Sequence, residues 1–271
     1  MQLITDIKMQ KNKISKGQDR RNPYPGVLFI LLILIIACRN SLQVTGTENK
    51  QYIIGSGADT TADVIIMKLT GTYRDSLNQV MSEPLIFNKV AMIKELPEGN
   101  LGNFCSDLWY AAAVRYCKNQ QLRQPDFAVF NHGGLRSALP AGMLTLRNIF
   151  ELMPFENELV LCEIDKVHLD SLLNTIALKG GAPVANIQLR IHEGQVESAK
   201  YSASSDSSQK TVLVVTSDYL AGGNDNFTIF KTGTTRTTHL KLRDILIDEL
   251  RVRGTLNDTL QIQKDGRITK Y

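Results

Sequence analysis

The sequence predicts an α/β fold in which helices are layered on mixed sheets. Several segments repeat their apolar residues at helical spacing, and they alternate with stretches that are typical of strands. Two of the strand-like stretches are followed by paired glycines. The chain has 271 residues, of which 43% are apolar and 21% charged, so it can bury a core and is not generally disordered. We expect residues 61–271 to form one α/β domain.

The first part of this domain is expected to hold two helices separated by a strand. Residues 60–79 favour a helix capped by Thr60 or Thr61, although Gly71 weakens it. The next stretch alternates as a strand does, with apolar residues at Leu85, Phe87, Ala91 and Ile93. Beyond Gly99, helical spacing predicts a stronger helix with one buried face, formed by Leu101, Phe104, Cys105, Leu108, Ala112 and Tyr116.

Strands and helices are expected to alternate through the rest of the domain. Strands are predicted at residues 126–130, 158–164 and 211–216, with a hairpin across 187–201. Helices are predicted at residues 146–152, 165–179 and 238–253, the first two capped by Thr145 and Asp165. Asp265 and Gly266 predict a terminal hairpin, because an Asp-Gly pair favours the tight turn that matches strand twist.

Residues 1–38 are expected to be a lipoprotein signal peptide. A basic stretch precedes eleven apolar residues, Val27 to Ala37, a length that suits a signal-peptide core better than a membrane-spanning helix. The small Ala37 followed by Cys38 resembles a bacterial lipobox, which makes Cys38 the expected site of lipidation. A short membrane anchor is the alternative, and translation could also begin at Met9. We expect residues 39–60 to be a tether and the protein to be lipid-anchored on the periplasmic or cell-surface side.

The charge distribution excludes a nucleic-acid-binding role. The formal net charge of +4 comes from the first 38 residues, and the remainder holds equal numbers of basic and acidic side chains. Proteins that bind nucleic acids normally present a basic face. The balanced charge of the mature part provides none.

The cysteines beyond the leader are expected to be buried free thiols. Cys105 and Cys117 fall in one predicted helix, about 18 Å apart at the standard rise, which is too far for a disulfide. An odd number of cysteines also cannot pair internally without leaving one over. A zinc site is not expected, because the chain has no C-x-x-C or paired Cys/His spacing.

Polar and aromatic residues follow two predicted strands and indicate a ligand site. The strand at 126–130 leads into Asn131, Gly133, Gly134 and Arg136, and the strand at 211–216 leads into Tyr219, Gly222, Gly223 and Asp225. Open α/β sheets bind ligands at the carboxyl ends of their strands. Phe155 and Asn157 lie between the two segments in sequence. Aromatic rings can stack on a nucleoside base at roughly 1–3 kcal/mol each, while amides read its edge and a carboxylate binds its sugar. The alternative for Phe155 is an ordinary place in the core.

Four sequence blocks give the chain, from about Thr61 onward, a resemblance to the C-terminal, substrate-binding domain of the 5′-nucleotidase family. They are residues 98–103 (E-G-N-L-G-N), 131–136 (N-H-G-G-L-R), 152–157 (L-M-P-F-E-N) and 219–227 (Y-L-A-G-G-N-D-N-F). The resemblance implies that Phe155 and Tyr219 clamp the base and that Asp225 holds the ribose. It also implies that Asn131 and Arg136, at the glycine turn, contact the ligand. Asn157 matches a further contact of some members.

The chain departs from the family pattern at several of these positions. His132 stands where a glycine is usual, Tyr219 replaces phenylalanine, and the usual G-G-D-G becomes G-N-D-N over residues 223–226. Asparagine tolerates left-handed backbone better than most residues, so the last change is compatible with the turn. An arginine common in the family is absent, because that position is Glu95, with Lys94 beside it as a possible substitute.

The catalytic half of the family pattern is missing from this sequence. Family enzymes hydrolyse phosphate esters at a two-metal centre in an N-terminal metallophosphoesterase domain, which needs clustered Asp, His and Asn ligands. In this sequence the histidines are scattered over four segments, as His132, His168, His192 and His239. There is also no P-loop or G-x-S-x-G motif. We therefore expect neither a catalytic residue nor a metal site.

The expected function is therefore nucleotide recognition for a 5′-nucleotidase-type phosphoric ester hydrolase in nucleotide catabolism. A separately encoded metallophosphoesterase chain would hold the divalent metal pair and perform the chemistry. One alternative is a non-catalytic lipoprotein that binds nucleosides or nucleotides. Another is a structural remnant whose site is no longer used.

Overall fold

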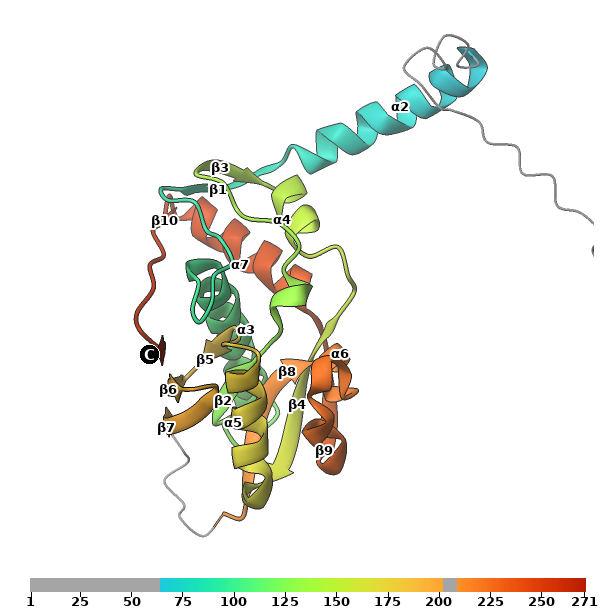
Figure 1. The fold of residues 1–271 in the computed structure, drawn as a ribbon. Coiled ribbons are helices and arrows are strands. Elements are labelled where there is room, and N and C mark those ends of the chain that lie inside the picture. The colour runs from blue at the N-terminus through green and yellow to red at the C-terminus, as the bar shows by residue number, and fades with distance from the viewer. Residues whose placement is uncertain (1–63, 202–208) are drawn as a thin grey trace, which may run out of the picture. The chain divides into compact units, whose positions relative to one another are not determined.

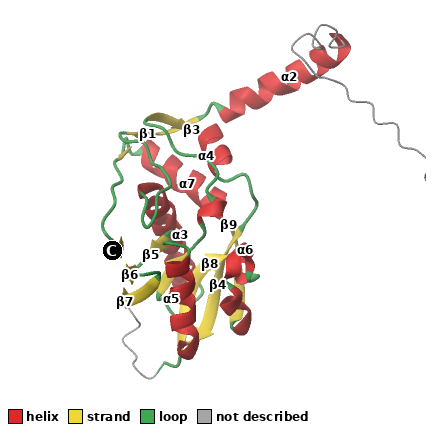
Figure 2. Cartoon of the chain, in the orientation of Figure 1, coloured by secondary structure: helices red, strands yellow, loops and turns green. Residues whose placement is uncertain are grey.

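The computed structural model describes residues 64–201 and 209–271. The predicted signal peptide, tether and first helix cap lie outside these residues. The described residues belong to one compact unit, Ala62–Tyr271. They form three sheets with helices packed on them, which confirms the predicted α/β class (Figures 1 and 2).

A mixed five-stranded sheet lies at the centre of the domain. Its strands follow the order β5 (Val184–Ala185), β2 (Phe127–Val129), β8 (Thr211–Ser217), β4 (Glu158–Asp165) and β9 (Thr234–Lys241). Strands β2 and β8 run parallel, with Ala128 opposite Val215. The other neighbouring strands pair antiparallel. The predicted strands at 126–130, 158–164 and 211–216 are thus confirmed, and all three belong to this sheet.

The central sheet is buried on both faces. Successive residues of β2 alternate between two hydrophobic clusters, with Phe127 and Val129 in one and Ala128 and Phe130 in the other. This alternation follows from the two-residue period of a strand. On one side pack α3 (Asn100–Asn119), α4 (Leu146–Leu152) and α7 (Leu242–Thr255). On the other pack α5 (Leu169–Leu178) and strand β6 (Ile187–His192).

Two small sheets complete the fold. In the first, β1 (Pro84–Asn88) lies between β10 (Thr259–Leu260) and β3 (Gly142–Thr145). In the second, β6 lies between β11 (Ile268–Lys270) and β7 (Gln195–Tyr201). The antiparallel pair of β6 and β7 is the hairpin predicted across residues 187–201.

Helix α2 (Val64–Met81) precedes β1 and confirms the helix predicted at residues 60–79, whose first four residues lie outside the described part of the chain. Its described side chains are largely exposed, as at Leu69 and Tyr73. No helix among the described residues combines the length and the apolar character needed to cross a membrane.

Helices α3 and α4 follow the predicted pattern closely. Buried residues of α3 include Leu101, Phe104 and Leu108, which the helical spacing predicted. Helix α4 begins after Thr145, whose backbone N–H donates to Oδ1 of Asn148 at 2.9 Å. The three described cysteines, Cys105, Cys117 and Cys162, are free and buried, as expected.

The predicted strand at 85–93 is wrong beyond Asn88. Leu85 and Ile86 are both buried, whereas Phe87 is 46% exposed, so burial along the strand does not follow the predicted alternation. The pairing of β1 with β3 shifts register between Pro84 and Ile86, which breaks the simple two-residue period. Beyond the strand, Met92 is buried and forms an isolated bridge with Leu139.

The predicted helix at 165–179 begins later than expected, at Leu169. Asp165 belongs to β4 and makes no capping bond, and a 3₁₀ turn, η3 (Lys166–His168), separates it from α5. Val167 is therefore exposed rather than part of the buried face. Pairing of Asp165 with Thr211 on β8 extends the strand, and this long-range contact outweighs the local capping signal.

The last part of the chain contains the largest corrections. Strand β9 was not predicted, and α7 begins at Leu242 rather than at Thr238. A terminal hairpin is also wrong, because β11 pairs parallel with β6 instead of folding back on the segment before it. Neighbours distant in sequence stabilise both strands, so local patterns do not reveal them.

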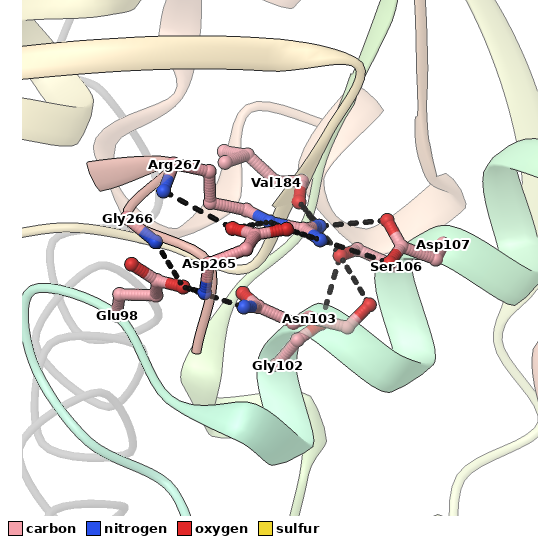
Figure 3. A network of polar contacts seen from close by, with 9 residues as sticks. All are labelled: Glu98, Gly102, Asn103, Ser106, Asp107, Val184, Asp265, Gly266 and Arg267. Carbon is pink, nitrogen blue, oxygen red and sulfur yellow. Dashed lines mark hydrogen bonds and ion pairs between the residues drawn. The ribbon is translucent and has the colours of Figure 1, made fainter. Parts of the chain in front are cut away.

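Glu98 fixes the C-terminal turn to the start of α3 (Figure 3). Its buried Oε1 accepts hydrogen bonds from Nδ2 of Asn103 at 2.6 Å and from the backbone N–H groups of Asp265 and Gly266 at 2.8 and 3.3 Å. A buried carboxylate is tolerated when donors satisfy it in this way. The turn predicted at Asp265 and Gly266 is thus present, but it docks on α3 instead of closing a hairpin.

Arg267 extends this network to the central sheet. Its guanidinium donates to Asp107 Oδ1 at 2.6 Å, to Asp265 Oδ2 at 2.6 Å and to the carbonyl of Val184 on β5 at 2.8 Å (Figure 3). The bonds from Arg267 also lower the pKa of Asp265. The C-terminal segment is therefore joined to both α3 and the sheet edge.

We predict that Glu98→Ala lowers the unfolding free energy by about 2–4 kcal/mol, because a buried amide and two partly buried backbone N–H groups lose a charged acceptor. Urea denaturation measures the change. Glu95→Ala is the matched control, since Glu95 makes only a partly exposed ion pair with Lys264 at 2.9 Å. That substitution should cost under about 1 kcal/mol. Equal effects of the two substitutions would contradict a structural role for Glu98.

Candidate functional site

Parallel pairing of β2 and β8 brings the two predicted strand ends together. Phe127 pairs with Val214 and Ala128 with Val215, so the strands end at the same edge of the sheet. The buried hydroxyl of Thr216 donates to the carbonyl of Val129 at 2.8 Å and joins the strands at that edge. The segments that leave both strands therefore start side by side.

Asn131 begins the segment that leaves β2 and connects it to the segment that leaves β8. Its Nδ2 donates to Oδ2 of Asp225 at 2.8 Å. The 3₁₀ turn η2 (His132–Gly134) follows directly. A Cβ atom at Gly133 would lie 3.1 Å from Nδ2 of Asn131, and one at Gly134 would lie 3.3 Å from its Oδ1. The paired glycines thus leave room for the amide to lie against the turn.

Asp225 occupies a left-handed turn on the other segment. Its φ and ψ are 52° and 32°, and Gly223 and Asn226 also have positive φ values of 79° and 65°. The turn therefore accepts asparagine at a position where glycine is usual. Oδ1 of Asp225 accepts a hydrogen bond from the hydroxyl of Tyr219 at 3.2 Å, and this carboxylate raises the pKa of Tyr219.

Phe155 lies in the loop that follows α4, and its ring is 49% exposed. The interpretation of Phe155 as a core residue is therefore wrong. The buried Arg243 at the start of α7 holds this loop, because its guanidinium donates to the carbonyls of Met153 and Pro154 at 3.2 and 3.4 Å and pairs with Glu156.

Two contacts attach the Phe155 loop to the strand-end segments. The guanidinium carbon of Arg136 lies 5.9 Å from the centroid of the Phe155 ring, within cation–π range. Nδ2 of Asn157 donates to Oδ1 of Asp218 at 2.9 Å, one residue before Tyr219. Tyr219 itself is 41% exposed and lies in the short helix α6 (Asp218–Ala221).

All eight predicted site residues line one cavity of about 410 Å³. They are Asn131, Gly133, Gly134, Arg136, Phe155, Asn157, Tyr219 and Asp225. The volume lies in the range of small-molecule sites in proteins. The cavity combines two partly exposed aromatic rings, one cation, one carboxylate and two amides, which suits a flat, polar ligand with hydroxyl groups.

A second cavity of about 500 Å³ adjoins the first. Asn131, Gly133 and Asp225 line both cavities. Lys94 and Lys179 also line the second, so the substitute cation that the sequence suggested lies next to the predicted site. Glu95 lines the same cavity and reduces its positive charge.

His132, the residue that replaces a family glycine, is held in its neutral form. Burial, with a smaller contribution from the nearby charge of Lys94, lowers its pKa to about 4. Its Nε2 is buried and has no hydrogen-bond partner among the described residues. Accommodating the imidazole beside the turn therefore has an electrostatic cost at acidic pH.

Two supporting residues, Asp218 and Arg243, were not predicted. Asp218 carries no sequence signal beyond its place before Tyr219. The sequence gives one signal for Arg243. It lies near the start of a helix, between the apolar residues Leu242 and Ile245, which favours a buried position. In neither case does the sequence indicate the partner, which comes from a distant loop.

No group of three or more His, Cys, Asp or Glu side chains is placed to hold a metal ion within residues 64–201 and 209–271. The site residues that carry charge are Arg136 and Asp225, and Asp225 is already bonded to Asn131 and Tyr219. Both charged groups can hydrogen-bond to a polar ligand.

Comparison with known families decides the relationship. Residues 80–232 match the family described as the 5′-nucleotidase, C-terminal domain. The chain belongs to this family. The match includes all eight residues of the cavity, and the resemblance seen in the four sequence blocks is confirmed.

Similar proteins include larger nucleotide phosphoesterases. The trifunctional nucleotide phosphoesterase protein YfkN of Bacillus subtilis is 26% identical over 179 residues, which cover 58% of this chain and 12% of that protein. The 5′-nucleotidase of Vibrio vulnificus is 27% identical over 107 residues, 38% of this chain and 19% of that protein. The chain thus spans less than a fifth of the length of these relatives.

Solved structures of the family share the fold. The 5′-nucleotidase precursor from Thermus thermophilus superposes with a TM-score of 0.62 at 21% identity, covering 77% of this chain and 43% of that one. The NAD nucleotidase of Haemophilus influenzae gives a TM-score of 0.56 at 17% identity, covering 77% and 41%. At these identities the likeness shows the fold alone.

We predict that His132 makes the 5′-nucleotidase C-terminal-like domain less stable at acidic pH. The unfolded imidazole takes up a proton below its ordinary pKa of 6.5, whereas the folded one does so only near 4. Stability is therefore full above pH 6.5 and is lost as the pH falls toward 4. When the pH is lowered from 7.5 to 5, the unfolding free energy of the wild type should fall by about 1–2 kcal/mol more than that of His132→Asn. Urea titrations at the two pH values measure both changes. An identical loss in both proteins would contradict the buried neutral state.

Proposed function

We propose that this protein recognises the nucleoside part of 5′-nucleotides or related phosphate esters, as the substrate-binding component of a 5′-nucleotidase-type phosphoric ester hydrolase in nucleotide catabolism. The metal-dependent step would be performed by a separately encoded metallophosphoesterase chain that holds a divalent metal pair. We further propose that lipidation at Cys38 anchors the protein on the periplasmic or cell-surface side of the membrane. Cys38 lies outside the described residues.

The observation that carries the proposal is the convergence of the eight residues on one cavity. Phe155 and Tyr219 both expose ring surface there, and stacking between aromatic rings and a base tolerates any base identity. Asp225 presents a carboxylate that can accept hydrogen bonds from ribose hydroxyls. Arg136, held near the Phe155 ring, supplies a permanent cation for the sugar or phosphate end.

Membership of the family supports the substrate class. Its C-terminal domain is the part that the chain matches, and two of the relatives are described as a nucleotide phosphoesterase and a 5′-nucleotidase. Recognition of the substrate is therefore the role that we assign to this domain.

We predict that Phe155→Ala weakens adenosine binding at least tenfold, since one stacking partner contributes roughly 1–3 kcal/mol. Isothermal titration calorimetry of the full chain measures the affinity. Phe87→Ala is the matched control, because Phe87 is exposed to a similar degree, 46%, on β1, outside the cavity. Unchanged affinity of Phe155→Ala for adenosine would contradict stacking of the base on Phe155.

We also predict that the purified chain alone releases no phosphate from AMP in the presence of manganese. The reason is that the residues of the cavity offer no site for a metal pair. A colorimetric phosphate assay compares the chain with a reaction without protein. Phosphate release that chelation by EDTA abolishes would show that the chain contains its own catalytic centre.

A further inference from the structure

Two carboxylates accept hydrogen bonds from three side chains of the cavity. Nδ2 of Asn131 donates to Asp225 at 2.8 Å, and the hydroxyl of Tyr219 donates to the other oxygen of Asp225 at 3.2 Å. Nδ2 of Asn157 donates to Asp218 at 2.9 Å. Each carboxylate therefore fixes the position of the side chains that bind it.

The bond to Asp218 also determines how the amide of Asn157 is turned. An ionised carboxylate has only acceptors, so Asn157 must direct its NH₂ group toward Asp218. Its Oδ1 has no donor among the described residues. Turning the amide over would bring two oxygens together at 2.9 Å, the distance that now separates Nδ2 from Oδ1 of Asp218. One orientation of the amide is thus strongly favoured.

Asp218 is itself held in place. The same Oδ1 that binds Asn157 accepts a hydrogen bond from the backbone N–H of Tyr219 at 2.8 Å. This bond lies in the first turn of α6, which also carries the ring of Tyr219 into the cavity. The orientation of Asn157 is therefore coupled to the same short helix that positions one of the two aromatic rings.

We propose that Asp218 acts as a positioning residue that makes Asn157 an acceptor, so that the cavity selects nucleosides whose base carries an exocyclic amino group. This inference rests on the proposed function. Asn157 is two residues from Phe155 and lines the same cavity, so it reaches the edge of a base stacked on that ring. An amino group at this edge donates to Oδ1 of Asn157. A base without the amino group leaves Oδ1 of Asn157 without this donor.

Adenosine and purine riboside test the inference, because they share the sugar and every ring nitrogen and differ only in the amino group of the base. By isothermal titration calorimetry, the full chain should bind adenosine at least about tenfold more tightly than purine riboside, the loss expected when a polar group is left unpaired.

Asp218→Asn tests the positioning role. An amide at residue 218 can either donate or accept, so Asn157 is free to turn, and the preference for adenosine over purine riboside should fall to within about threefold. Asn157→Ala should reduce the preference similarly. Asp170→Asn is the control, an equivalent change at an exposed acid on α5 that should keep the wild-type preference. Thermal unfolding of each variant confirms that it is folded.

The outcomes separate this inference from the function on which it rests. Equal affinity of the wild type for adenosine and purine riboside would overturn the selectivity while leaving nucleoside binding intact. A full preference retained in folded Asp218→Asn would overturn the role of Asp218. Failure of both nucleosides to bind would contradict the proposed nucleoside site, and the inference would fall with it.

Discussion

The site depends on one pairing, the parallel contact between β2 and β8 at the centre of the main sheet. Parallel strands end at the same edge, and residues that follow them are brought together although they are distant in sequence. Asn131 and Asp225 are the direct result, because their hydrogen bond closes the gap between the two segments. Burial of this sheet by helices on both faces makes the pairing rigid.

Within this frame, carboxylates organise the cavity. Asp225 joins Asn131 to Tyr219, and Asp218 joins Asn157 to the first turn of α6. Arg243 performs the corresponding task for the Phe155 loop by binding its carbonyl groups. These bonds hold exposed aromatic rings in place, which lowers the entropy cost of ordering them when a ligand binds.

The fold was predictable where local pattern and tertiary contact agree. Helix α3 has a buried face with regular spacing, and α4 lies between a capping threonine and a proline, so both were expected with nearly the observed ends. Strand β9 was missed because it is largely exposed and is held by its pairing with β4, and β11 because its partner β6 is distant in sequence. The first strand was wrong beyond Asn88, since a register shift breaks its period.

The sequence by itself determined the family, the class of fold and the eight residues of the cavity. Glycine turns, strand ends and aromatic positions are recognisable from short blocks of neighbouring residues. Only the tertiary structure decided that Phe155 is exposed rather than in the core, that Glu98 docks the C-terminal turn, and that Asp218 orients Asn157. The physical reason is the range of the interactions. Hydrogen-bond partners such as Asn157 and Asp218 come from separate loops, and no local pattern in either loop specifies the other.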